Sequence, residues 1–147
     1  MKIKIKKLNE NAKIPTRGSD YAAGYDLYAE IPAETKVVGV HPGETVKFRT
    51  GIAVAIPEGF FGAIYARSGL STKKGLRPVN CVGVVDSDYR GEIIVSLHND
   101  SSKVWSIENH DRIAQLVIQE FQPVEFEEVD ELDTTDRGKD GFGSTGK

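Results

Sequence analysis

The sequence is poor in several features that mark specialised classes of protein. It contains a single cysteine, Cys81, so no disulfide can form within the chain, and we expect a reducing, cytoplasmic location. No apolar run approaches the roughly 18 residues that a membrane-spanning helix needs, so we expect no membrane association. The basic start MKIKIKK lacks the apolar stretch of a signal peptide, and its alternation of isoleucine with lysine is typical of a half-buried strand.

The chain also lacks a strong excess of charge. It has 19 Lys and Arg against 22 Asp and Glu, a net charge of -3, which gives no overall attraction to nucleic acid or to anionic lipid. No basic patch with interleaved aromatic residues is present, and we expect no nucleic-acid partner. A polyanionic ligand would therefore have to be bound by a few local groups.

Apolar and polar residues alternate in short segments bounded by Gly, Pro, Asn or Asp, which is the pattern of β-strands. No segment keeps a 3.6-residue apolar period for three turns. With 147 residues, the size of one domain, the chain is predicted to form an all-β sandwich or barrel. The predicted strands are 2–7, 25–29, 45–48, 52–56, 61–66, 82–85, 93–97 and 113–121.

One short helix is predicted over Ser68–Gly75, because Ser68 can cap its start and glycine closes it. Its amino end offers free N–H groups to an anion. From Glu125 onward the composition changes, with seven acidic residues in the twelve positions 125–136. We expect a compact β body with the binding pocket over residues 1–129 and a flexible C-terminal arm over residues 130–147, acidic first and then Gly-rich.

The end of the arm, RGKDGFGSTGK, carries four glycines, one aromatic residue and three cationic residues. Flexible glycines present N–H groups to phosphate oxygens, Arg137 offers a bidentate fork, and Phe142 offers a stacking face. These groups suit the phosphate chain and base of a nucleotide. The alternative is an idle, disordered terminus.

The segment ARSGLS, residues 66–71, is a second candidate for phosphate binding. Arg67 and Ser68 lie where a predicted strand ends and the helical turn begins, so a cation, a hydroxyl and free N–H groups converge there. Alternatively, Arg67 is a solvated arginine and Ser68 an ordinary N-cap.

The segment NCVGVVDSDYRGE, residues 80–92, is the strongest candidate for catalysis. We predict a β-hairpin in which strands 82–85 and 93–97 project Asp86, Asp88 and Tyr89 from the polar turn. At the end of an apolar strand, a partly desolvated Asp86 could orient or deprotonate a water, and Tyr89 could pack on a sugar. Alternatively, Asp86 makes an Asx turn, Tyr89 lies at the core edge, and Asn80 is a turn amide.

Two further strands carry single polar groups. Asp26, in AAGYDLYA, could bind Mg²⁺ directly or through water, because hard cations prefer oxygen ligands. Gln115, in DRIAQL, could be a buried amide satisfied by backbone groups.

Taken in order, AAGYDLYA, ARSGLS, NCVGVVDSDYRGE, DRIAQL and RGKDGFGSTG resemble the five motifs of the trimeric dUTPase family, whose members hydrolyse dUTP to dUMP and pyrophosphate. One position departs from the family's tail pattern, since Asp140 stands where glycine is usual. The resemblance implies a jelly-roll-like β fold, a homotrimer, active sites at subunit boundaries, and a C-terminal arm that closes over a site.

The resemblance also implies roles for individual residues. Asp86 would activate the attacking water, Asp26 would hold Mg²⁺ through water, and Ser68 would meet the oxygen that bridges the α and β phosphates. Tyr89 would lie under the deoxyribose and reject a ribonucleotide. The remaining substrate-binding residues would be Arg67, Gln115, Arg137 and Ser144 on phosphate oxygens, Asn80 and backbone near Val84 and Tyr89 on the uracil edge, Phe142 over the uracil ring, and Gly69, Val85 and Gly143.

Two alternatives to dUTP hydrolysis are compatible with a nucleotide-binding β fold. The first is a dCTP deaminase-like enzyme of the same fold, which needs an added carboxylate beside the predicted hairpin; the sequence shows none there. The second is a non-catalytic, nucleotide-binding regulatory trimer, against which the presence of Asp86 argues. A dUTP hydrolase would limit uracil incorporation into DNA and supply dUMP for thymidylate synthesis.

Overall fold

The computed structural model describes residues 1–141, so the predicted site residues Phe142, Gly143 and Ser144 lie outside the described residues. The described part contains one short helix, and its remaining regular elements are strands, which confirms the all-β prediction. The elements are β1 (Lys4–Lys7), β2 (Thr16–Arg17), β3 (Tyr25–Tyr28), β4 (Val37–Val40), β5 (Thr45–Arg49), β6 (Ile52–Ala55), β7 (Phe60–Tyr65), α1 (Ser68–Lys74), β8 (Leu76–Pro78), β9 (Val82–Val85), β10 (Ile94–Asn99), β11 (Trp105–Glu108) and β12 (Arg112–Glu120).

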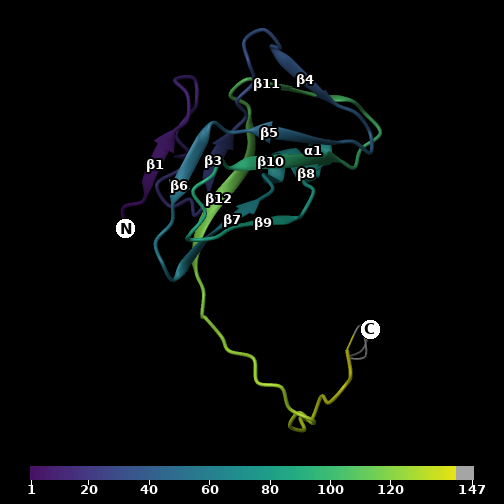
Figure 1. The fold of residues 1–147 in the computed structure, drawn as a ribbon. Coiled ribbons are helices and arrows are strands. Elements are labelled where there is room, and N and C mark those ends of the chain that lie inside the picture. Colours follow the sequence, from purple (N-terminus) through teal and green to yellow (C-terminus); the bar gives the residue numbers. More distant parts are fainter. Residues whose placement is uncertain (142–147) are drawn as a thin grey trace.

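The strands form two larger sheets and two smaller two-stranded ones (Figure 1). The largest has the order β2-β3-β12-β7-β9, and the second has the order β5-β10-β8. The small sheets are β1-β6 and β11-β4. Every named pair is antiparallel, so the fold is a layered β structure in which strands distant in sequence pair with each other.

The core lies between these sheets and follows from strand alternation. In β10, Val95, Leu97 and Asn99 point inward while the residues between them are more exposed. Leu27, Leu97 and Ala114 are fully buried. A register shift in β12 between Arg112 and Ala114 turns both Ile113 and Ala114 into the core, as a β-bulge does.

Each of the predicted strand segments overlaps an observed strand, but four further strands were missed. β2 has two residues and β8 has three, including Pro78, so neither carries a readable alternation. β4 and β11 pair with each other, from Val37 opposite Glu108 to Val40 opposite Trp105, and Gly39 interrupts the apolar pattern of β4. Tertiary pairing supplies these strands where the local signal is weak.

The predicted hairpin between residues 82–85 and 93–97 is wrong. β9 pairs with β7 in the five-stranded sheet, whereas β10 pairs with β5 and β8 in the three-stranded sheet. The chain between them therefore crosses from one sheet to the other. A long polar connection does not impose the register that a two-residue turn would, and each strand pairs with partners in its own sheet instead.

The predicted helix is present, but its cap is not Ser68. Arg67 is the N-cap residue, with extended φ and ψ and no side-chain capping bond, and Ser68 is the first helical residue. Gly75 ends the helix in the left-handed region at φ 68°, with its N–H on Ser71 O at 3.1 Å. Serine was a reasonable cap by type, but the capping position falls one residue earlier.

The chain after β12 leaves the body as an extended segment (Figure 1). Residues 121–140 are exposed and contain no strand or helix. The structure thus ends the regular β body at Glu120, and the division at residue 129 stays a prediction. No helix within residues 1–141 is long and apolar enough to cross a membrane.

Asn99 is a buried polar residue whose side chain is fully used. Its amide donates to Val40 O and Lys103 O at 2.8 Å each, and its oxygen accepts from Ser101 N at 2.9 Å and Ser101 Oγ at 2.7 Å.

We expect Asn99→Ala to lower the free energy of unfolding by about 3 kcal/mol, since each buried polar group left without its hydrogen bond costs about 1–3 kcal/mol. Denaturant titration at fixed protein concentration measures this, and the exposed Asn109, with its single bond to Ile31 N at 3.0 Å, provides the matched Asn109→Ala control. Equal losses for the two variants would contradict the assigned role of Asn99.

Candidate active site

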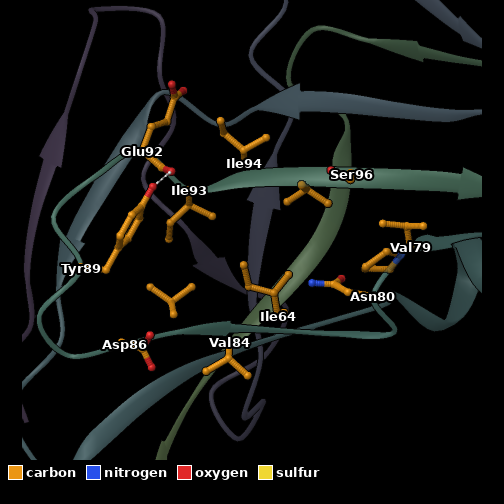
Figure 2. A pocket seen from close by; sticks show the side chains of 14 residues that line it. Ile64, Val79, Asn80, Val84, Asp86, Tyr89, Glu92, Ile93, Ile94 and Ser96 are labelled. Atoms are coloured by element: carbon orange, nitrogen blue, oxygen red, sulfur yellow. Dashed lines mark hydrogen bonds between the residues drawn. The ribbon is translucent and has the colours of Figure 1, made fainter.

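A cavity of about 300 Å³ lies between the two larger sheets, where β9 and β10 separate. Its wall includes Ile64 from β7, residues 78–80 after β8, residues 83–85 of β9, and the start of β10. Figure 2 shows Asp86 and Tyr89 toward one end and Asn80 and Val79 toward the other. The cavity therefore brings together Asn80, Val84, Val85, Asp86 and Tyr89 from the predicted site.

Asp86 follows the last residue of β9 and lines this cavity. Its backbone is held because Asp86 O accepts from Tyr89 N at 3.2 Å, and the preceding Val85 is buried opposite Gly62 of β7. The side chain is exposed, so the partial desolvation expected from the sequence is absent in the single chain. Among the described residues no hydrogen bond or ion pair takes up its carboxylate, which leaves both oxygens able to accept a bond from water.

Asn80 and Tyr89 provide different kinds of surface to the cavity. The Asn80 amide lies against Gly83, where an added Cβ would come within 3.3 Å of its nitrogen. Tyr89 presents its ring, and its hydroxyl donates to Glu92 O at 2.9 Å. One end can thus meet a polar ring edge by hydrogen bonds, and the other can pack on a sugar face.

Several cavity residues were not predicted as site residues. Val79, Glu92 and Ser96 line the cavity, and Val79 N donates to Ser96 O at 2.9 Å. Arg77 donates to Val79 O and makes a bidentate contact with the Asp100 carboxylate, at 2.6 and 3.2 Å. The hydrogen bonds to Asp100 raise the pKa of Arg77. Strand alternation could have placed Ser96 on one face, but only the sheet arrangement shows which face borders the cavity.

A second group of polar residues is centred on Asp26 of β3. Asp26 is 8% exposed, and its carboxylate accepts from Arg67 Nε at 2.7 Å and from Arg112 Nη1 at 3.3 Å. The contact through Nε leaves the terminal nitrogens of Arg67 available to an anion. Arg112 was not predicted as part of the site, although it precedes Gln115 in the DRIAQL segment.

Gln115 and the start of α1 complete this second group. Gln115 lies opposite Asp26 and Tyr65 in the five-stranded sheet, and its amide donates to Ala66 O at 2.9 Å. The predicted backbone contact of Gln115 is therefore present, with its side chain packed against Gly24. Ser68 and Gly69 are exposed at the start of α1.

The two groups do not meet within one chain. Asp86 follows Val85, which is paired with Gly62 at one end of β7, whereas Arg67 follows the other end. Arg67 comes five residues after Gly62, which is roughly 15 Å along an extended chain. Arg137 is held locally, donating from Nε to Asp140 O at 2.8 Å, and has no hydrogen bond or ion pair to either group within the described residues.

The residues present fit Mg²⁺ only as a partner of a bound anion. Within residues 1–141 no three His, Cys, Asp or Glu side chains are grouped to hold a metal. Asp26 has one arginine donor on each oxygen, and each carboxylate oxygen has a second lone pair. The donor set is thus compatible with a Mg²⁺ that takes its direct ligands from phosphate and water and contacts Asp26 through water.

Known proteins similar to this chain point to one family. A model of the dUTPase family matches residues 10–146. Two proteins named deoxyuridine 5'-triphosphate nucleotidohydrolase are similar over the full length: one from Corynebacterium glutamicum, 48% identical over 99% of this chain and 95% of that protein, and one from Nautilia profundicola, 46% identical over 100% of both.

Solved structures agree with this similarity. A point mutant of the dUTPase of Staphylococcus bacteriophage 80alpha, solved with dUpNHpp, superposes with a TM-score of 0.87 at 29% identity, and the match covers 99% of each chain. A point mutant of the dUTPase from phage phi11 of S. aureus, described for the coordination of a structural Mg(II) ion, has a TM-score of 0.79 at 26% identity, over 91% of this chain and 100% of that one. These likenesses confirm the jelly-roll-like fold class. They favour neither the dCTP deaminase-like enzyme nor the non-catalytic, nucleotide-binding trimer. The resemblance seen in the five motifs is confirmed, and the chain belongs to the dUTPase family.

Proposed function

We propose that this dUTPase-family enzyme cleaves dUTP by attack of a water on the α-phosphorus. The protein is a nucleotide hydrolase, and its products are dUMP and pyrophosphate. The water oxygen forms a bond to the α-phosphorus while the bond to the oxygen bridging the α and β phosphates breaks. Asp86 orients the water and takes its proton. The observation that carries the proposal is the free Asp86 carboxylate at the edge of a cavity that also holds Asn80 and Tyr89.

Base and sugar selection is assigned to the cavity between the sheets. Asn80 and backbone groups of Val84, Val85 and Tyr89 pair with the polar edge of uracil, and the Tyr89 ring packs under the deoxyribose. Cytosine reverses donor and acceptor at one ring position, which leaves buried groups unpaired at about 1–3 kcal/mol each. The proposal is supported by the size of the cavity, about 300 Å³, and by the nature of its lining.

Phosphate binding is assigned to the second group and to the arm. Arg67, Ser68, Gly69 and Gln115 contact phosphate oxygens, with Ser68 at the oxygen that bridges the α and β phosphates. From the arm, Arg137, Gly143 and Ser144 hold the remaining oxygens and Phe142 lies over the uracil. This assignment is supported by the exposed Ser68 and Gly69 beside an Arg67 that Asp26 orients through Nε.

We further propose that the enzyme uses Mg²⁺, with Asp26 contacting the ion through water. Bound to the triphosphate, Mg²⁺ would neutralise part of the charge that opposes attack. Arg67 and Arg112 keep the Asp26 carboxylate oriented in the absence of the ion.

A homotrimer with sites at subunit boundaries is part of the proposal. Asp86 and Arg67 lie at opposite ends of β7, and this separation supports a site to which a second chain contributes one of the two. A second chain would also bury two exposed apolar surfaces. One is a groove of about 450 Å³ beside β1, lined by Ile3, Ile5 and Leu116 among others, and the other is Phe126, which is 94% exposed.

The division into a body over residues 1–129 and an arm over residues 130–147 is kept as a proposal, with the arm acting as a lid. We also propose a cytoplasmic location, consistent with a free, exposed Cys81. There the enzyme limits uracil incorporation into DNA and supplies dUMP for thymidylate synthesis.

Pyrophosphate release from dUTP, dCTP, dTTP and UTP tests the proposed selectivity. We expect kcat/KM for dUTP to exceed that for dCTP by about 100-fold, because two unpaired groups at about 1.4 kcal/mol each give that factor. The Asp86→Asn protein, prepared in parallel, controls for contaminating phosphatases. Equal rates with all four nucleotides would contradict the selectivity, and ammonia release from dCTP would favour the deaminase alternative.

A further inference from the structure

The Tyr89 ring is held at its hydroxyl by the chain that follows it. The hydroxyl donates to Glu92 O at 2.9 Å (Figure 2). The ring also lies so close to Gly91 that a Cβ there would overlap the hydroxyl. Tyr89 itself is 45% exposed, so core packing alone does not fix the ring. The orientation of the ring therefore depends on where the Glu92 carbonyl lies.

The Glu92 side chain fastens this carbonyl to the turn between β5 and β6. Its carboxylate accepts from Arg49 Nε at 2.9 and 3.2 Å and from Gly51 N at 2.8 Å, and the side chain is 13% exposed. Gly51 has φ +67°, and a Cβ there would lie 2.6 Å from Ala12 Cβ, so the turn packs closely against Ala12 and requires glycine. A nearly buried carboxylate that accepts from two donors, one of them a charged guanidinium, is a strong and directional anchor.

The next residue is tied to the same turn. Ile93 N donates to Ile52 O at 2.9 Å, and the buried Thr50 hydroxyl donates to Ile93 O at 2.6 Å. The segment from Glu92 to Ile93 is thus held by side-chain and backbone bonds together. The carboxylate that binds Arg49 and Gly51 belongs to the same residue, Glu92, as the carbonyl that accepts from the Tyr89 hydroxyl.

We infer that Glu92, through Arg49 and Gly51, is a positioning residue that sets the Tyr89 ring and thereby the discrimination between deoxyribose and ribose. The inference rests on the proposed function, in which Tyr89 packs under the sugar. Glu92 contacts no reacting atom in this arrangement. Its loss changes how closely the ring approaches the sugar and leaves the Asp86 chemistry in place.

The test compares kcat/KM for dUTP and UTP in Glu92→Gln, Tyr89→Phe and the double variant. The amide of Glu92→Gln keeps one acceptor but turns a donor toward Arg49, and Tyr89→Phe removes the hydroxyl link. We expect each single variant to lower the dUTP-over-UTP ratio about tenfold, mainly through KM for dUTP, with kcat within about twofold. The double variant is expected to be no worse than either single one, because both changes break the same connection.

Glu30→Gln is the matched control. Glu30 also lies beside Arg49, at 4.0 Å, and is 15% exposed, but no bond connects it to Tyr89 in the described residues. It should leave the ratio unchanged. If Glu92→Gln does not fold, Arg49→Lys gives the same test, since lysine keeps the charge but lacks the Nε–H that both Glu92 oxygens accept from.

The outcomes separate this inference from the proposed function. Additive effects in the double variant, or an unchanged ratio in Glu92→Gln, would overturn the role of Glu92 while the hydrolysis of dUTP stands. Failure of the unaltered protein to release pyrophosphate from dUTP would overturn both.

Discussion

Asp86→Asn is expected to lower kcat for dUTP by about 10²–10⁴-fold, the range that a positioned general base contributes. Asparagine has nearly the shape of aspartate and can still contact a water, but it cannot accept the proton of the attacking water. KM should change little, because Asp86 lies at the edge of the cavity and leaves Asn80 and Tyr89 in place. Pyrophosphate release measures kcat, and equilibrium binding of the dUTP analogue dUpNHpp measures retained affinity.

Asp88→Asn is the matched control for this prediction. Asp88 lies two residues away in the same connection, is exposed, and does not line the cavity. It should retain close to full activity. An Asp86→Asn protein that released pyrophosphate at the full rate would remove the basis for the catalytic assignment, and equal losses in both variants would point to the loop conformation instead.

Deleting residues 137–147 is expected to lower kcat/KM for dUTP by about 10²–10³-fold. The deletion removes Arg137, Phe142 and Ser144, which the proposal places on the nucleotide. Base–aromatic stacking alone contributes about 1–3 kcal/mol, and a closed lid also orients the phosphate and excludes bulk water. Phe142→Ala should account for part of the loss, on the order of tenfold.

The truncated body should remain folded, because residues 121–140 are exposed and the strands end at Glu120. Circular dichroism and the unfolding midpoint should therefore match the full chain. Leu132→Ser, a change at an 84% exposed position of the tether, controls for altered arm composition. A truncated protein with undiminished turnover would contradict the lid.

Mixing subunits extends this experiment to the proposed trimer. The Asp86→Asn chain and the truncated chain are each expected to be nearly inactive alone. Refolded together, they should regain part of the activity if the arm of one chain serves the Asp86 of another. Absence of any recovery, with mixed assemblies demonstrated, would indicate that the arm and Asp86 of one chain serve the same site.

The sequence predicted strand positions well where apolar alternation was continuous. β10 and β12 were found because apolar residues run through both segments, with polar residues between them such as Ser96 in β10 and Gln115 in β12. β2 and β8 were missed because two or three residues cannot show a period, and their pairing depends on β3 and β10. The predicted hairpin failed for the same reason, since partner choice is a non-local property.

The candidate site shows the same division. Asp86, Asn80 and Tyr89 were predicted from residue type and motif order, and the structure places all three around one cavity. Glu92 and Arg112 were not assigned roles, because a glutamate or arginine in a polar stretch gives no local sign of its partner. Their contacts with Arg49 and Asp26 join residues 43 and 86 positions apart.

The sequence by itself determined the β class, the family and the types of group available for binding and cleaving a nucleotide, because alternation and motif order are properties of neighbouring residues. Only the tertiary structure decided that β9 and β10 belong to different sheets, that a cavity opens between them, and that Asp86 and Arg67 lie at opposite ends of β7. These features depend on which strands pair and in what register, and pairing is settled by packing across the whole chain.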